Sequence, residues 1–254
     1  MRTLSDRELV ALWERAAREH PLVRALHMLD ASRDGGRARV ARDGSETGEL
    51  ADLDMGERNR RLMALFVASF GPRLEFGSSC PECEERVEVD MDLRHILTDE
   101  VGDDRIFRAA TGGLTVRFRL PSTRDLLAVT GCDDARAARA TLLARCIVDC
   151  RRDGDGEAAA TTDLPRAVLE HVAGQMGQCD PHAEILARMT CPECGTDWRT
   201  MLDIGELVWA RMAARARTAL QAVHVLARAY AWSESDILAM SDTRRALYLS
   251  MVDA

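Results

Sequence analysis

Two identical tetrapeptides, Cys-Pro-Glu-Cys, carry four of the eight cysteines of this chain and could bind a metal ion. The first contains Cys80 and Cys83, and the second contains Cys191 and Cys194. Each CxxC turn can offer two thiolates, and two turns complete the tetrahedral four-sulfur shell of a structural zinc site. Such a shell leaves no coordination position for a substrate or for water. We therefore predict that these four cysteines hold one structural Zn²⁺ per chain.

The similarity between the two motifs extends beyond the four shared residues. The sequences read CPECEERVEVDMDLRHIL from Cys80 and CPECGTDWRTMLDIGELV from Cys191. Asp92 and Asp203 stand at the same distance after the first cysteine of each copy, flanked by apolar residues. Each copy is predicted to run strand, turn, strand and then the start of a helix. The residues between the copies, 84–190, far exceed the spacing of a compact zinc ribbon, so the predicted ribbon is split.

Other uses of a CxxC motif fit this sequence less well, with one exception. A thioredoxin-type redox motif requires a helix N-terminus after a βαβ pattern, whereas both copies here lie between predicted strands. Two separate disulfides are disfavoured in a reducing compartment. An iron centre of the rubredoxin type uses the same four-sulfur geometry, and the residues alone leave it open as an alternative to zinc.

The remaining cysteines have weaker claims to a metal. Cys179 and His182 lie just before the second motif and are the best substitute ligands, although four thiolates already saturate one ion. Cys146 and Cys150 are four residues apart within a predicted helix, which is typical of buried small side chains. Cys132 belongs to no recognisable pattern.

The overall composition restricts the class of protein. The chain has 254 residues, a net charge of −8 and no lysine among its 34 basic residues, a bias typical of a GC-rich bacterial genome. The acidic balance disfavours broad binding to nucleic acid or to anionic membranes. No apolar run approaches the roughly 20 residues of a membrane span, and the N-terminus resembles an amphipathic helix rather than a signal peptide. We expect a bacterial cytoplasmic protein whose thiols stay reduced.

No catalytic motif is present, so we predict a protein that is not an enzyme and has no small-molecule substrate. The sequence contains no GxSxG, HExxH or EF-hand pattern, and ATGGLT lacks the lysine of a phosphate-binding loop. Arginines at 57–61 and at Arg211, Arg215 and Arg217 could contact phosphate, but solvated helix faces explain them better. If these arginines do contact phosphate, the protein is a nucleic-acid-binding zinc-ribbon regulator, which remains the alternative function.

Apolar periodicity and capping residues predict an α+β fold, mostly helical, with a split four-cysteine zinc ribbon and a β-hairpin-containing insertion. Helices are expected within 5–30, over 55–70, 122–150 and from Asp163-Leu164-Pro165 to about 180, then over 203–230 and after the caps Ser233 and Ser241. Strands at 105–110 and 114–120 would form the hairpin. The expected segments are 1–70 (helical, with loop 31–50), 71–96 (first knuckle), 97–182 (insertion, with a second loop at 151–162), 183–202 (second knuckle) and 203–254 (C-terminal helices).

The chain also resembles a known family. The segments that carry the resemblance are VAGQMGQCDPHAEILARMTCPECGTDWRTMLDIGELVWARM, VHVLARAYAWSESDILAMSDTRRALYLSMV and the opening LVALWERAAREHPLVRALHML. They resemble the T-even-phage-type baseplate hub assembly chaperones found with contractile phage tails and extracellular contractile injection systems.

This resemblance implies a non-enzymatic protein that assembles, or remains in, the baseplate or hub of a tail-like particle. Its partners would be baseplate, hub or spike proteins. The region 203–252 would present helices to such a partner, with Trp209, Tyr230 and Trp232 as candidate contacts, although core packing is the simpler interpretation of each of the three.

Overall fold

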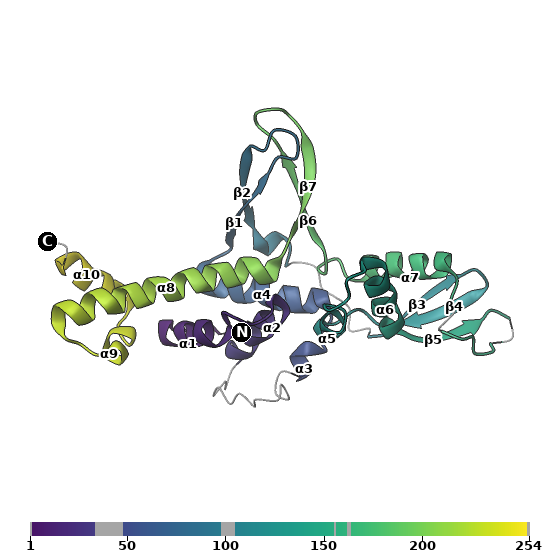
Figure 1. Cartoon of the computed structure of the whole chain (residues 1–254), viewed down its shortest axis with the longest axis horizontal. Helices are drawn as coiled ribbons and strands as arrows, with labels where there is room; N and C mark the ends of the chain where they lie inside the picture. Colours follow the sequence, from purple (N-terminus) through teal and green to yellow (C-terminus); the bar gives the residue numbers. More distant parts are fainter. Residues whose placement is uncertain (1, 34–47, 98–104, 155, 162–163, 253–254) are drawn as a thin grey trace. The chain divides into compact units, whose positions relative to one another are not determined.

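The computed structural model confirms the α+β fold and describes residues 2–33, 48–97, 105–154, 156–161 and 164–252 (Figure 1). About half of the chain is helical. The chain divides into two compact units. Residues 1–42, 62–73 and 203–254 form the helical unit, and residues 43–61 and 74–202 form the ribbon unit. Among the described residues, no helix combines the length and apolarity that crossing a membrane requires.

The helical unit is organised around the long helix α8 (Ile204–Tyr230), as the apolar pattern after Asp203 predicted. The side chain of Asp203 caps this helix by accepting a hydrogen bond from the Glu206 N–H. Helices α1 (Asp6–Ala16) and α2 (Pro21–Ala31) pack against α8. Alanines at 216, 219 and 222 are buried on α8, and such small side chains allow neighbouring helices to approach closely.

The remaining helices complete the core of this unit. The second half of α4 (Met55–Phe70) contributes the buried side chains of Leu62, Met63, Leu65 and Phe66. Ser233 caps the short helix α9 (Glu234–Leu238), as predicted, by accepting a hydrogen bond from the Asp236 N–H. The last helix, α10 (Asp242–Val252), begins directly after Ser241.

Two antiparallel two-stranded ribbons form the first part of the ribbon unit and lie side by side (Figure 1). One consists of β1 (Arg73–Ser79) and β2 (Arg86–Asp92), followed by the 3-10 turn η1 (Leu93–His95). The other consists of β6 (Ile185–Thr190) and β7 (Asp197–Leu202), paired from Ile185↔Leu202 to Thr190↔Asp197. The Trp198 indole N–H donates to the Ser78 hydroxyl across the two ribbons. A CPEC motif occupies the turn of each ribbon.

The second part of the ribbon unit is a three-stranded sheet with helices packed on it. Strands β3 (Phe107–Thr111) and β4 (Leu114–Phe118) form the predicted hairpin, and β5 (Ile147–Arg152) pairs with β4. Helices α6 (Ala135–Cys146) and α7 (Arg166–Cys179) bury Leu143, Val172 and Met176 in a core with Val116 and Phe118 of β4. The short helices α3 (Gly48–Ala51) and α5 (Thr123–Leu127) also belong to this unit.

Three predictions of local structure were wrong in part. Residues 122–150 are not one helix: α5 and α6 are separate, and residues 147–152 form the third strand of the sheet. Cys150 therefore lies on β5, not on a helix face with Cys146, although both are buried as predicted. Helix α7 begins after Pro165 without a side-chain cap, and the predicted cap Asp163 lies outside the described residues. In the predicted loop 31–50, the helix α3 begins at Gly48 and residues 34–47 are not described.

Buried polar contacts join the start of α4 to the segment that follows α7. The Gly56 N–H donates to Asp180 Oδ2 at 2.9 Å, and the Asn59 amide donates to the His182 carbonyl at 2.9 Å. Arg58, predicted to lie on a solvated face, is instead buried and donates to Asn59 and Thr123. Arg60 and Arg61, by contrast, pair with Glu57 at the surface of the helix. Burial raises the pKa of Asp180, and the hydrogen bond from Gly56 and the charges of His182 and Arg58 offset this rise only in part.

The close approach of Gly56 to Asp180 generates a stability prediction. A Cβ atom at residue 56 would lie 1.6 Å from Asp180 Oδ1, so Gly56→Ala must displace that buried carboxylate and break its hydrogen bond. We expect a loss of about 2–4 kcal/mol in the free energy of unfolding, measured by urea denaturation of the metal-loaded protein.

Gly174→Ala is the matched control, because a Cβ built at that position of α7 meets no atom within 4 Å beyond its chain neighbours and the backbone of its own helix. Alanine favours a helix interior over glycine, so this variant should be more stable than the parent by about 0.5–1 kcal/mol. Equal effects of the two substitutions would contradict the packing described for Gly56.

Candidate metal centre

The two ribbon turns bring together the four cysteines that the sequence singled out. The sulfur atoms of Cys80, Cys83, Cys191 and Cys194 all lie within 4.8 Å of one another. Across the two turns, Cys80 Sγ lies 3.6 Å from Cys194 Sγ, and Cys83 Sγ lies 3.5 Å from Cys191 Sγ. Cys80 and Cys191 are buried, whereas Cys83 and Cys194 are exposed. The cluster thus has one solvent-facing side and one side inside the protein.

These distances suit a tetrahedral metal ion. Four thiolates at the usual Zn–S distance of about 2.3 Å stand about 3.8 Å apart at the corners of a tetrahedron. The two cross-turn distances are close to that value, and each pair joins one cysteine of the first motif to one of the second. The donor set is sulfur alone, which zinc and iron both accept. The geometry therefore fits one shared ion better than two separate sites.

The two turns have the same backbone hydrogen bonds, which confirms the internal repeat. In the first, the Cys80 N–H donates to the Glu85 carbonyl and the Glu84 N–H donates to the Cys80 carbonyl. In the second turn, the Cys191 N–H donates to the Thr196 carbonyl and the Gly195 N–H donates to the Cys191 carbonyl. The residue after the second cysteine is left-handed in both turns, with φ of 61° at Glu84 and 73° at Gly195. The sequence supplies the favourable glycine at only one of these two positions.

Two of the four thiols, those of Cys83 and Cys194, have pKa values shifted in opposite directions. Hydrogen bonds with the side chain and backbone of Thr196 lower the pKa of Cys194 to about 6. A backbone hydrogen bond from Glu85 favours the Cys83 thiolate, but its contacts with Cys191, Cys194 and Cys80 raise the Cys83 pKa to about 12. The Cys194 thiolate therefore forms readily, whereas formation of the Cys83 thiolate beside it is opposed. A divalent cation removes this opposition by neutralising the charge that the sulfurs share.

The equivalent aspartates of the repeat have equivalent local roles. Asp92 accepts a hydrogen bond from the Arg94 N–H and so caps η1, while Asp203 caps α8. Each cap starts the first helical turn after its ribbon. Both residues are therefore structural, and neither belongs to the group of residues that could hold a metal.

The proposed substitute ligands do not join the cluster. His182 is buried, and its Nε2 lies 2.9 Å from the Ile96 carbonyl, which fixes the segment before β6. Cys179 is half-buried at the end of α7, and burial raises its pKa. Cys132 is exposed. Thr196 and Trp198, which the sequence did not single out, support the cluster through the contacts with Cys194 and Ser78.

The comparison with protein families gives a match over most of the chain. The model of a family described as T4 bacteriophage base plate protein matches residues 42–209. The matched region is about two-thirds of the chain and contains both CPEC motifs and all the residues between them. No curated protein matches the chain, and no solved structure does so.

The shared-ion geometry predicts the metal content of the protein. Elemental analysis of purified protein should give about one zinc atom per chain, and Cys191→Ser should lose it, because three thiolates bind the ion more weakly than four. Cys132→Ser is the matched control, since this exposed cysteine lies outside the cluster, and it should keep the full metal content. Two zinc atoms per chain would contradict a shared site, and iron in place of zinc would correct the identity of the metal.

The left-handed residues of the two turns should respond oppositely to substitution. A left-handed conformation costs a residue other than glycine about 1–2 kcal/mol, partly offset by the greater unfolded-state entropy of glycine. We therefore expect Glu84→Gly to stabilise the zinc-loaded protein by about 0.5 kcal/mol and Gly195→Ala to destabilise it by about 1 kcal/mol. Urea denaturation at fixed zinc concentration measures both. Changes of the same sign would refute the structural equivalence of the two turns.

Proposed function

This chain belongs to the family of T4 bacteriophage base plate proteins, and we propose that it is a non-enzymatic, zinc-containing assembly factor or component of a baseplate or hub. The particle would be a contractile phage-tail-like injection system, and the partners would be its baseplate, hub or spike proteins. The family match over residues 42–209 carries the baseplate part of this proposal, and the cluster of four sulfurs from two turns far apart in the sequence carries its zinc part. Cys80, Cys83, Cys191 and Cys194 are its proposed zinc ligands.

The cluster supports a mechanical role for the metal. Four thiolates complete the coordination of one zinc ion and leave no position at which a substrate could bind. The zinc would instead hold the two ribbons together, because each ribbon is a two-stranded sheet that is marginally stable alone. A protein stabilised in this way can present a fixed surface to a partner.

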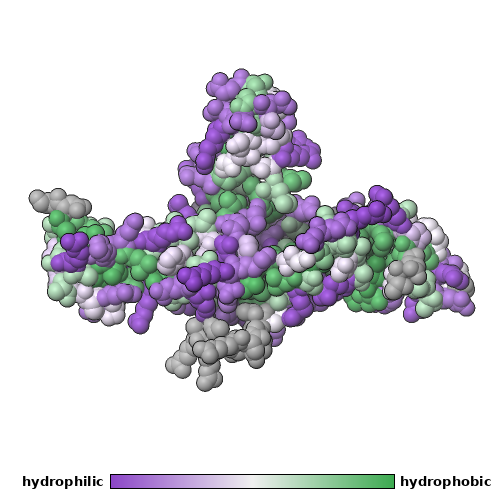
Figure 2. Space-filling model, viewed as in Figure 1, coloured by the Kyte–Doolittle hydropathy of each residue, from purple (hydrophilic) through white to green (hydrophobic). Residues whose placement is uncertain are grey.

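The C-terminal helices offer the most apolar candidate surface of the helical unit. Leu247, Met251 and Val252 of α10 are exposed at 57%, 54% and 36%, and hydrophobic residues are visible at this end of α10 in Figure 2. Beside them, Tyr230 and Trp232 stack with ring centroids 4.5 Å apart, and Tyr248 meets Trp232 edge-on at 4.8 Å. Half-buried aromatic residues next to exposed aliphatic ones are typical of protein-binding surfaces.

One of the three predicted contact residues does not fit this surface. Trp209 is buried in the core of the helical unit, with the Arg24 guanidinium 5.3 Å from its ring centroid. Its role is packing, since a buried indole offers a partner no contact area. Tyr230 and Trp232 remain candidates, and Leu247 and Met251, which the sequence did not single out, join them.

A purification from the producing cell tests this function. With the tagged full-length chain as bait, we expect baseplate, hub or spike proteins of a tail-like particle to co-purify. The double variant Leu247→Asp/Met251→Asp should reduce their recovery at least tenfold, because two charges on α10 would have to lose their hydration on binding.

Met201→Asp is the matched control, because Met201 is also exposed, at 64%, but lies on β7 of the ribbon unit. It should leave the recovery unchanged. Loss of the partners in this variant alone would show that the binding surface lies on the ribbon unit. Recovery of DNA with salt-sensitive affinity, and of no tail protein, would favour the nucleic-acid-binding regulator instead.

A further inference from the structure

A groove runs between helices α6 and α7 of the ribbon unit (Figure 1). It consists of two hollows of about 510 and 620 Å³. Arg139, Leu143 and Glu170 line both hollows, so the two adjoin along the helices. None of the residues that line the groove belongs to the four-cysteine cluster. Two hollows in line suit an elongated ligand, such as a helix, better than a compact small molecule.

Helix α6 forms one wall of the groove and is largely uncovered. Of its twelve residues, only Leu143 and Cys146 are buried. Its exposed residues include Arg136, Arg139 and Ala140, which line the smaller hollow. Much of α6 is therefore available to a partner.

Two glycines of α7 open the other wall of the groove. Gly174 and Gly177 are about one turn apart on the helix, and both line the larger hollow. A Cβ built at either residue meets no atom within 4 Å beyond its chain neighbours and the backbone of its own helix. Glycine is destabilising in a helix interior relative to alanine, so these two residues weaken α7 without improving its packing. Close approach of another helix would account for both, because small side chains allow a short distance between helix axes.

The charges that line the groove differ between its two ends. Near the start of both helices lie Arg136, Arg139 and Arg166, and the last of these pairs with Glu170 at 2.7 Å. Arg136 and Arg139 form no ion pair with any residue that the structure describes. The carboxyl groups that line the opposite end belong to Asp180 and Glu184. A partner that matches this lining is acidic at one end only.

We propose that this groove binds an amphipathic helix of a partner protein, apolar along one side and acidic at one end. Its apolar side chains would enter the two hollows over Ala140 and Leu143, and its backbone would pass close to Gly174. The carboxylates at its acidic end would pair with Arg136 and Arg139.

A nucleic-acid strand fits the groove less well. None of the described residues that line it is aromatic, whereas single strands bind by stacking their bases on aromatic side chains. The carboxyl groups in the lining would also repel phosphates. The proposal rests on the groove alone, so a failure of the baseplate function would leave it standing.

A titration monitored by NMR tests the proposal on the full-length, zinc-loaded protein. The probe is a helical peptide of about 15 residues, with leucine at every third or fourth position and two glutamates in its first turn. We expect it to shift the backbone amide signals of Ala140, Gly174 and Gly177, with a dissociation constant of about 0.1 mM. A peptide with glutamine in place of the glutamates should bind about fivefold more weakly. A peptide with glutamine in place of the leucines should cause no shift.

Several results of this titration would overturn the proposal. They are the absence of shifts at about ten times the expected dissociation constant, shifts confined to another surface, and equal binding of the peptide without leucines. Shifts of the same signals on dilution of the protein alone would assign the groove to a second copy of this chain. Shifts caused by a single-stranded DNA of about 15 nucleotides would assign it to nucleic acid. Either assignment would replace the one proposed.

A substitution that fills the groove tests its location. Gly177→Leu places a side chain in the open space of the larger hollow without a clash in the free protein, so the affinity for the peptide should fall at least about tenfold. Gln178→Leu is the matched control, because Gln178 is exposed on the same helix and does not line the groove. Equal affinities of the two variants would show that the peptide does not lie in the groove.

A charge reversal tests the position of the acidic end. In Arg136→Glu, the new carboxylate cancels the charge of Arg139, so the peptide with glutamates should bind no more tightly than the peptide with glutamines. Arg108→Glu is the matched control, since Arg108 is exposed on β3 and does not line the groove, and it should keep the fivefold difference. Persistence of that difference in Arg136→Glu would overturn the pairing proposed for Arg136.

Discussion

The meeting of four sulfur atoms from two distant turns is the constraint on which the ribbon unit depends. The segment between the two pairs, residues 84–190, contains the complete three-stranded sheet and its helices. Closing so long a loop is unfavourable in entropy, although this cost grows only slowly with length. Neither two-stranded ribbon has a large core of its own, and structural zinc can contribute about 10 kcal/mol or more to folding. A metal ion bound by these four cysteines would thus link folding of the ribbons to correct placement of everything between them.

Hydrogen bonds within the protein also hold the two ribbons together, at the ends of the ribbons away from the cysteine turns. His182, two residues after Asp180, contacts the Ile96 carbonyl next to η1, and its own carbonyl accepts from Asn59 of α4. Asp180 binds the Gly56 N–H at the start of the same helix. The chain that enters β6 and the chain that leaves β2 are therefore fixed by buried hydrogen bonds as well as by the sulfurs. These contacts explain why His182 is buried and conformationally fixed without being a metal ligand.

Much of this could be predicted from the sequence, because the informative signals are local. Repeated CPEC motifs, the caps Asp203 and Ser233, and the periodicity of α8 each depend on residues within a few positions of one another. The errors have non-local causes. The sequence predicts a helix where β5 lies, because Ile147 and Cys150 become strand residues only through pairing with Phe118 and Val116 of β4. Arg58 was assigned to the surface because its burial depends on Asn59 and on Thr123, a residue distant in the sequence.

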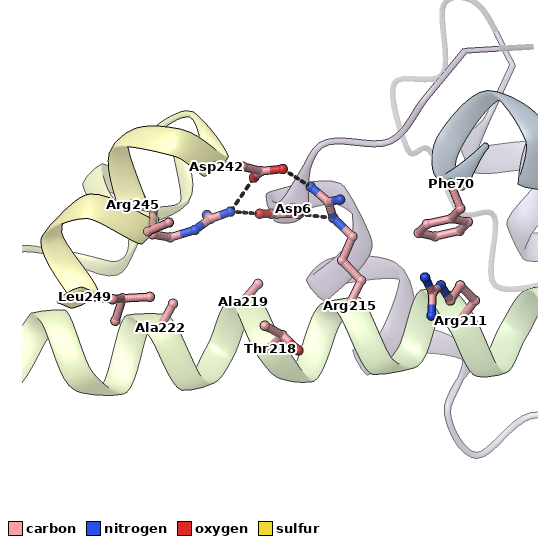
Figure 3. A pocket seen from close by; sticks show the side chains of 11 residues that line it. Asp6, Phe70, Arg211, Arg215, Thr218, Ala219, Ala222, Asp242, Arg245 and Leu249 are labelled. Carbon is pink, nitrogen blue, oxygen red and sulfur yellow. Dashed lines mark hydrogen bonds and ion pairs between the residues drawn. The ribbon is translucent and has the colours of Figure 1, made fainter. Parts of the chain in front are cut away.

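The ion-pair network of Asp6, Arg215, Asp242 and Arg245 in the helical unit shows the same limit most clearly (Figure 3). Asp6 and Arg245 lie near opposite ends of the chain, and only the packing of α1 and α10 on α8 brings them together. A largely buried ion pair contributes little net stability, because the loss of hydration of both charges offsets most of their attraction. Well-packed apolar residues would serve the fold alone at least as well. What the network can add is a preference for one packing of α1, α8 and α10, because another packing would leave a charge buried without its partner.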